Sequence, residues 1–237
     1  INGAKQKVGN YRIEPPGIFL GRGNHPKLGK IKKRINPEDV TINLDKNAPI
    51  PKPNVPGRWK EVIHDNSVIW LATWTDTITK KNKYVFTSME SIFKSKSDEK
   101  KFDLARKLKK KAKDIRKTYT SDLDDKSTQK KQLATALYFI DNLALRVGGK
   151  KDTKEKADTV GVTSLRVEHL TFLGKDIIKL DFLGKDSIRY CKKIKLHHNV
   201  FNNLKSFTEK KNKKDQLFDR ITSSNLNEYL ESFMKGL

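Results

Sequence analysis

The 237-residue sequence has little of several features that mark particular protein classes. It contains one cysteine, Cys191, which excludes an internal disulfide framework and favours a reducing compartment such as the cytosol or nucleus. No stretch approaches the ~18 apolar residues of a membrane-spanning helix, and the N-terminus carries no apolar signal region. The five histidines are not spaced with cysteines or carboxylates as zinc ligands are. We therefore expect neither a structural metal nor a membrane partner.

Acidic residues are scarce relative to basic ones. Lysine and arginine number 51 against 28 aspartates and glutamates, which gives a formal net charge of +23. Such an excess is typical of proteins that bind a polyanion, and nucleic acid is a better candidate than a membrane surface. The length and the hydrophobic fraction of 35% suffice for one large core or two modest ones. We expect two domains, residues 1–90 and 91–237.

The first domain should contain β-strands joined by long turns. Residues 1–58 are rich in glycine and proline, which favour turns. The segments 62–64 and 68–74, separated by Asp65 and Asn66, predict a β-hairpin, and the segment 83–87 predicts a further strand. This β-containing domain should end near residues 88–93.

The second domain should be mainly helical. Apolar residues recur every three or four positions from Phe102 to Tyr119, which predicts a helix with one apolar face and one basic face. A second helix should run from about Thr128 to Arg146 and stop at Gly148 and Gly149, so that Arg146 lies at a helix end.

The remaining pattern predicts a small sheet and two closing helices. Alternation over residues 165–169 indicates a strand. The apolar alternations at 178–182 and 188–190 flank a tight turn, which places Lys185 at a hairpin tip. Helices are expected at about 199–208 and 224–235, the latter capped by Ser224. The fold class is α+β: a small β-containing lobe followed by a mainly helical lobe with a short antiparallel sheet.

Three short motifs carry a family resemblance. They are Gly-Arg-Gly-Asn-His-Pro-Lys at 21–27, Ala-Leu-Arg-Val-Gly-Gly at 144–149 and Phe-Leu-Gly-Lys-Asp-Ser-Ile-Arg-Tyr at 182–190. In this order they resemble the eukaryotic type IB DNA topoisomerases, and the resemblance runs from about Tyr11 to the C-terminus. It implies a capping lobe over residues 1–90 and the first half of a catalytic lobe over residues 91–237, of the kind shared with tyrosine recombinases. It also implies that Arg146 and Lys185 are catalytic and that Arg22 enters the minor groove beside the cleaved bond.

The chemistry explains why these two residue types are needed. Breaking a DNA strand by transesterification adds negative charge to the phosphate oxygens, which the planar, always charged guanidinium of Arg146 can clamp with two hydrogen bonds. The expelled 5′-oxygen needs a proton, which a lysine such as Lys185 can supply. Without the resemblance, Arg146 would be read as a cation at a helix C-terminus worth ~0.3–1 kcal/mol. Lys185 would be read as an ordinary turn lysine.

Other positions match family residues that touch DNA. Any single lysine among them could equally be a solvated surface charge. The resemblance also implies a clamp that closes around DNA, with one lip near Lys27 and the other near Glu155. An exposed pair between the lips would contribute ~0–1 kcal/mol. The expected DNA contacts are Arg22, Trp70, Lys83, Tyr84, Lys101, Val147, Gly148, Gly149, Lys150, Lys151, Thr159, Asp186 and Asn227.

The resemblance implies relaxation of supercoiled DNA in the nucleus, during replication and transcription, through a transient 3′-phosphotyrosine bond and religation. Neither ATP, a metal nor another cofactor is implied, and the loop at Gly21 lacks the strand–loop–helix setting of a nucleotide-binding fingerprint. The family's second arginine, histidine and nucleophilic tyrosine match nothing up to Leu237, and none of the six tyrosines lies in a nucleophile motif.

We therefore expect the chain alone to bind double-stranded DNA without cleaving it. Its expected partners are DNA and either a missing C-terminal segment or a second subunit that carries the tyrosine. Two alternatives are a non-catalytic DNA-clamp subunit and a relative of the site-specific tyrosine recombinases. The motifs around Arg22 and Trp59 argue against the recombinase.

Overall fold

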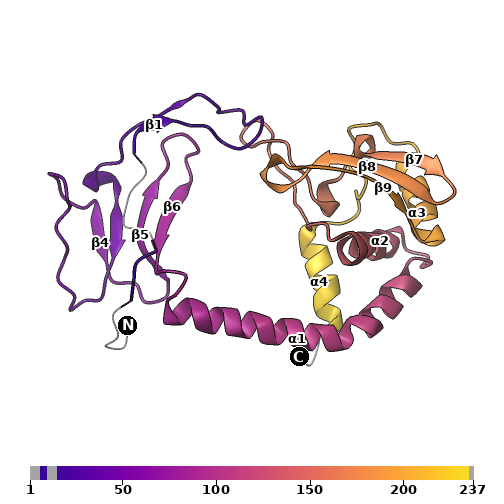
Figure 1. Cartoon of the computed structure of the whole chain (residues 1–237), viewed down its shortest axis with the longest axis horizontal. Coiled ribbons are helices and arrows are strands. Elements are labelled where there is room, and N and C mark those ends of the chain that lie inside the picture. Colours follow the sequence, from indigo (N-terminus) through magenta and orange to yellow (C-terminus); the bar gives the residue numbers. More distant parts are fainter. Residues whose placement is uncertain (1–5, 10–14, 235–237) are drawn as a thin grey trace. The chain divides into compact units, whose positions relative to one another are not determined.

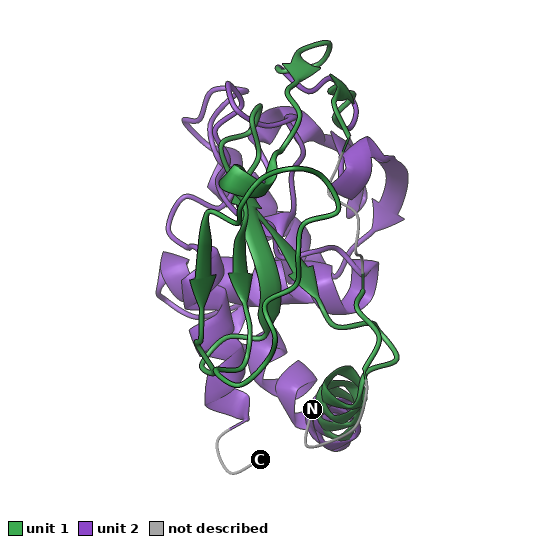
Figure 2. Cartoon of the chain, turned by 90° about the vertical axis from the view of Figure 1, so that its left-hand side faces the viewer, with its two compact units in different colours: residues 1–21, 27–103 green, residues 22–26, 104–237 purple. Residues whose placement is uncertain are grey.

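The computed structural model describes residues 6–9 and 15–234, and it separates into two compact units (Figure 2). Unit 1 comprises residues 1–21 and 27–103, and unit 2 comprises residues 22–26 and 104–237. Each unit has its own hydrophobic core. The boundary falls inside one long helix, α1 (Ile92–Asp122), drawn without interruption in Figure 1. Tyr11 and the C-terminal end of the last predicted helix, at Lys235, lie outside the described residues.

Unit 1 is built on a four-stranded sheet. Its strands are β3 (Thr41–Asn43), β4 (Glu61–Ile63), β5 (Trp70–Thr75) and β6 (Asn82–Phe86), in the spatial order β4-β3-β5-β6. Strand β3 runs parallel to β4 and antiparallel to β5. A short 3₁₀ turn (Pro37–Asp39) leads into β3. The core of this unit consists of Val40, Ile42, Trp74 and Val85.

The predicted hairpin over residues 62–74 is wrong, because β3 lies between the two strands. The buried side chain of Asn43 explains the arrangement. Its Oδ1 accepts from the Asp65 backbone N–H at 2.9 Å, and its Nδ2 donates to the carbonyls of Asp65 and Trp70 at 2.8 and 3.2 Å. Asn43 therefore holds both ends of the connecting loop against β3, whereas the predicted strand at 83–87 is confirmed as β6.

A separate two-stranded ribbon carries the glycine-rich loop. Strand β1 (Gly17–Ile18) pairs antiparallel with β2 (Ile31–Lys32). Gly21 and Gly23, in the connecting loop, have φ values of 65° and 55°, which glycine adopts without strain. Residues 22–26 of this loop group with unit 2.

Helix α1 confirms the predicted helix but buries only part of its apolar face. Ile115 and Tyr119 pack into the core of unit 2, whereas Phe102 is 65% exposed and Leu108 is 38% exposed. The three- and four-residue spacing shows that the segment is helical; it does not show which turns have a partner. The C-terminal end of α1 is fixed by the Tyr119 hydroxyl, which donates to Asp141 at 2.8 Å.

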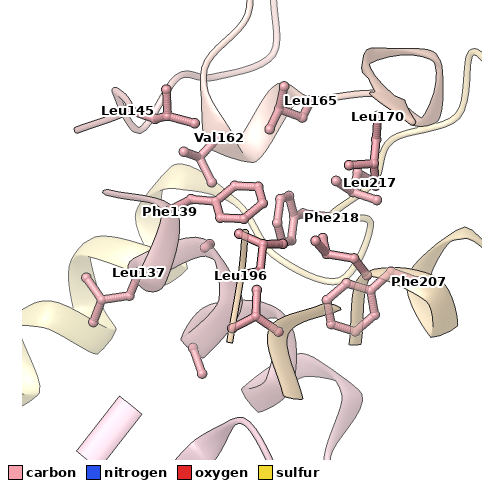
Figure 3. Packing of buried hydrophobic residues seen from close by; sticks show 14 of the residues in the cluster. Leu137, Phe139, Leu145, Val162, Leu165, Leu170, Leu196, Phe207, Leu217 and Phe218 are labelled. Atoms are coloured by element: carbon pink, nitrogen blue, oxygen red, sulfur yellow. The ribbon is translucent and has the colours of Figure 1, made fainter. Parts of the chain in front are cut away.

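Unit 2 contains three further helices and a three-stranded antiparallel sheet, whose buried residues share one core. The helices are α2 (Thr128–Leu143), α3 (His198–Thr208) and α4 (Ser223–Phe233), and the strands are β7 (Leu170–Gly174), β8 (Ile177–Leu183) and β9 (Arg189–Lys195), in the order β7-β8-β9. The rings of Phe139 and Phe218 meet edge to face in the core, with centroids 6.1 Å apart (Figure 3). Alternate residues of β8 are buried against this core.

Three local predictions in unit 2 need correction. Helix α2 ends at Leu143, because Ala144 adopts a left-handed conformation (φ 53°), so the glycines at 148–149 are not its stop. Residues 165–169 form no strand; two 3₁₀ turns, Val162–Ser164 and Val167–His169, occupy this region. Helix α4 is capped by Thr222 in place of Ser224, since the Thr222 hydroxyl accepts from the backbone N–H of Asn225. Among the described residues, no helix is long and apolar enough to cross a membrane.

Candidate functional site

Arg146 lies in an extended segment beyond helix α2. Its side chain is exposed, while the preceding Leu145 is buried. The backbone pairs with one neighbouring segment: the carbonyl of Arg146 accepts from the N–H of Val162 at 2.8 Å, and that of Val147 accepts from the N–H of Thr163 at 2.8 Å. Arg146 is therefore held by backbone pairing, and the alternative of a cation at a helix end does not describe its position. We call residues 158–163 the strap.

Two glycines make this pairing possible. Gly148 has a φ of +75°, and a Cβ built on it would lie 2.5 Å from the Cα of Gly161 in the strap. A Cβ on Gly161 would in turn lie 2.6 Å from the carbonyl oxygen of Arg146. No side chain fits in either place, so the close approach of the two backbones depends on glycine at both positions.

Lys185 lies at the tip of the β8–β9 hairpin, as predicted. The Gly184 N–H donates to the Ile188 carbonyl at 2.8 Å, and Asp186 and Ser187 have φ values of 64° and 60°. This tight tip leaves the Lys185 side chain exposed. The strap reaches this hairpin as well, because the N–H of Val160 donates to the carbonyl of Leu183 at 2.8 Å.

The strap, the Arg146 segment and the hairpin tip border one cleft within unit 2, with a volume of about 710 Å³. Arg22 forms an ion pair with Asp186 there, and Gly23 lies against the side chain of Ser187. The side chains that line the cleft include the cations Arg22, Arg146, Lys151, Lys156 and Lys185, with Asp186 as the one carboxylate among the lining residues. Such a concentration of fixed positive charge suits a phosphate ligand.

The structure brings many of the predicted DNA contacts together in this cleft. Lys151 donates a hydrogen bond to the hydroxyl of Thr159, which joins two of them directly. Gly149 lies near the start of α4, where a Cβ would be 4.0 Å from the Ser223 hydroxyl. The predicted residues that line the cleft are Arg22, Arg146, Val147, Gly148, Lys151, Thr159, Lys185 and Asp186.

The other predicted residues lie elsewhere. Lys150, Glu155 and Asn227 are exposed in unit 2 and do not line the cleft. Lys101 is exposed on α1. Lys27 belongs to unit 1, where its ammonium group donates to the carbonyl of Ile78 at 3.2 Å.

Unit 1 presents the predicted Trp70 and Tyr84 together on one face of its sheet. Their ring centroids lie 6.0 Å apart, and Phe86 lies 6.0 Å from Tyr84 on the same face. Lys83 points to the opposite face of β6, because neighbouring strand residues alternate and it pairs with Trp74. Sequence reasoning missed Phe86, although its spacing of two from Tyr84 was a readable signal.

The structure also adds lining residues that the sequence did not single out. Lys156 and Ser187 border the cleft. Two tyrosines, by contrast, are unsuited to attack a phosphate: the hydroxyls of Tyr119 and Tyr229 donate to carboxylates at 2.8 and 2.6 Å. Burial raises the pKa of Tyr119 to about 12, and burial likewise raises that of Tyr229. In the described part of the chain, no group of three or more His, Cys, Asp or Glu side chains could hold a metal ion.

Comparison with known proteins assigns the chain to a class of DNA-binding enzymes. The family model described as "Eukaryotic DNA topoisomerase I, catalytic core" matches residues 90–237, and that described as "Eukaryotic DNA topoisomerase I, DNA binding fragment" matches residues 1–87. The chain belongs to the eukaryotic DNA topoisomerase I family.

The chain matches only part of the length of its relatives. DNA topoisomerase 1 of Caenorhabditis elegans is 51% identical over all of this chain, which covers 31% of that protein. The Schizosaccharomyces pombe protein of the same name is 49% identical (100% of this chain, 29% of that protein), and the Homo sapiens protein is 48% identical (98% and 31%). The chain therefore spans about a third of the length of these relatives.

Proposed function

We propose that the chain is the DNA-binding and partial catalytic segment of a type IB topoisomerase, which relaxes supercoiled nuclear DNA through a transient 3′-phosphotyrosine bond. One observation carries the proposal: the strap pairs with the Arg146 segment at one end and with the Lys185 hairpin at the other, on the border of a cation-lined cleft. Two groups suited to phosphoryl transfer are thus held by one backbone segment.

In this proposal, Arg146 binds the oxygens of the scissile phosphate. Its guanidinium offers two parallel donors that stay charged at any working pH, and the charge it meets grows in the five-coordinate transition state. Because the surrounding backbone is already paired, little reorganisation is needed when the substrate binds. Arg22, held by Asp186, contacts the DNA beside the cleaved bond.

Lys185 acts as the general acid. Protonation of the departing 5′-oxygen requires an ammonium group that reaches the leaving group, and a hairpin tip can enter a groove of the duplex. The phosphotyrosyl bond conserves the energy of the phosphodiester, so resealing needs neither ATP nor a metal. The tyrosine is supplied by a C-terminal segment or by a second subunit.

The remaining contacts hold the duplex. Val147, Gly148, Gly149, Lys150, Lys151, Thr159 and Asn227 are proposed to contact DNA in unit 2, and Trp70, Lys83, Tyr84 and Lys101 to do so outside it, most of them at phosphates. Lys27 and Glu155 are proposed as the lips of a clamp that closes around DNA. By itself the chain binds duplex DNA and does not cut it.

The test is relaxation of supercoiled plasmid, with EDTA and without ATP, by this chain mixed with a C-terminal polypeptide from the same gene. We expect relaxation that requires both polypeptides and falls by orders of magnitude in Arg146→Ala and Lys185→Ala. Lys213→Ala removes an exposed lysine that does not line the cleft, and it is the matched control. A folded, DNA-binding mixture without relaxation would instead indicate a non-catalytic clamp. Cleavage restricted to one DNA sequence would indicate a recombinase.

A further inference from the structure

We infer that Arg166 is a positioning residue that anchors the strap and thereby holds the Arg146 segment and the Lys185 hairpin in register. This inference rests on the proposed function, because it concerns how the same two catalytic groups are held. No motif in the sequence singles out Arg166.

Arg166 forms a bidentate ion pair with Asp158, the first residue of the strap. Its two terminal nitrogens donate to Asp158 Oδ1 and Oδ2 at 3.0 and 2.8 Å, and its Nε donates to Glu168 Oε1 at 2.5 Å. The Arg166 side chain is only 23% exposed. The Asp158 side chain is 48% exposed, so water reaches one side of the pair, but its bidentate geometry fixes orientation as well as distance.

A histidine completes the surroundings of Arg166. The backbone N–H of Arg166 donates to Nδ1 of His169 at 3.0 Å, and Nη2 of Arg166 lies 3.2 Å from Nε2 of the same ring. Burial and the positive charge of Arg166 lower the pKa of His169, so the neutral ring is favoured. The ring centroid lies 6.1 Å from that of Phe182, in the strand that leads to the hairpin tip.

The backbone around Arg166 is itself paired with the segment 215–216. Arg166 bridges to Gln216, and the N–H of Val167 donates to the Asp215 carbonyl at 3.0 Å. The ammonium group of Lys211 in turn donates to the carbonyls of Gln216 and Leu217 at 3.0 and 3.1 Å. The backbone around Arg166 is therefore held in place by hydrogen bonds of its own.

The residues before Asp158 form an exposed local turn. The backbone N–H groups of Glu155 and Lys156 both donate to the carbonyl of Asp152, at 3.2 and 3.0 Å. Beyond Asp158, the strap bonds to the Leu183 carbonyl through the N–H of Val160 and to the Arg146 carbonyl through the N–H of Val162. If the Arg166–Asp158 pair is broken, the hydrogen bonds of the strap to Leu183 and Arg146 lose the side-chain anchor at its N-terminal end.

The test uses the full-length protein of which this chain is a segment. Single-turnover cleavage of a duplex substrate and DNA affinity are measured for Arg166→Ala, Arg166→Lys, Asp158→Asn and the charge swap Asp158→Arg with Arg166→Asp. The matched control is Arg116→Ala, which removes another bidentate arginine–aspartate pair, with Asp141, away from the cleft.

We expect cleavage by Arg166→Ala to slow by ~10- to 100-fold, because a shift of about 1 Å in a catalytic group costs this much, while DNA affinity stays within a few-fold. Arg166→Lys should cleave as slowly as Arg166→Ala, because lysine cannot form the bidentate pair. The charge swap of residues 158 and 166 should restore part of the cleavage rate. Should Arg166→Ala not fold, Asp158→Asn, which changes no volume, decides the question.

Two results would overturn the inference: cleavage as fast as in Arg116→Ala, or a loss of DNA affinity as large as the loss of rate. Arg146→Ala is assayed in parallel. If it cleaves at the normal rate, the proposed function fails, and that failure is distinct from a failure of the anchor alone.

Discussion

Replacing Gly148 with alanine should destabilise unit 2 for two separable reasons. The backbone of Gly148 has a φ of +75°, which costs an alanine ~1–2 kcal/mol. The new Cβ would also lie 2.5 Å from the Gly161 Cα, whereas ordinary contacts of this kind begin at 3.4 Å. Overpacking of this kind costs ~1–3 kcal/mol, so the expected total is ~2–5 kcal/mol.

Two other glycines separate these contributions. Gly174 has a φ of +84° with no atom near its Cβ position, so Gly174→Ala reports the backbone cost alone. Gly149 has no positive φ and its nearest Cβ neighbour is 4.0 Å away, so Gly149→Ala reports the general effect of replacing glycine, within ~1 kcal/mol of zero. The order of destabilisation should be Gly148, then Gly174, then Gly149.

The assay is urea unfolding of the chain followed with two probes. All three tryptophans, Trp59, Trp70 and Trp74, belong to unit 1, so their fluorescence reports that unit. Far-ultraviolet circular dichroism reports mainly helices, and α2, α3 and α4 belong to unit 2. In Gly148→Ala, the urea midpoint followed by circular dichroism should fall. Equal stability of Gly148→Ala and Gly149→Ala would refute the close packing of the two backbones.

Three further predictions concern single side chains. Tyr229→Phe should lower the free energy of unfolding by ~1–2 kcal/mol in a denaturant titration, because the Tyr229 hydroxyl donates to Asp122 at 2.6 Å; a change below that of Tyr190→Phe would contradict this. His169 has a lowered pKa in the fold, so the unfolded chain binds more protons and the wild type should lose stability as pH falls below ~6.5. His169→Gln should flatten this dependence between neutral and mildly acidic pH, and an unchanged slope would count against a buried neutral ring. Lys151→Ala should reduce the slope of log affinity against log salt by about 1 in duplex-binding titrations, and no change would place Lys151 away from the phosphates.

Local sequence patterns predict the elements of this protein better than their partners. The 3.6-residue period identifies α1, and the alternation around Gly184 identifies the β8–β9 hairpin and its lysine tip. The hairpin assigned to residues 62–74 fails, because the strand that separates its two halves comes from residues 41–43. No pattern within residues 62–74 indicates that the buried side-chain amide of Asn43 binds the loop between β4 and β5.

The candidate site shows the same limit. Motifs point to Arg146, Lys185 and Arg22, and all three line one cleft. The strap escapes notice, because its role depends on backbone hydrogen bonds that any residue can make. Arg166 and His169 are not identified from the sequence either, because the alternation that contains His169 predicts a strand, whereas the region forms 3₁₀ turns.

Under the proposed function, a support shared by Arg146 and Lys185 would affect the lifetime of a nick. Cleavage and resealing pass through one transition state in opposite directions, so a looser strap raises the same barrier for both. The fraction of DNA that is cut at equilibrium would then stay constant, while each nick would persist longer. A duplex that swivels freely during that longer interval would lose more supercoils in each opening, so a slower enzyme would be a more processive one.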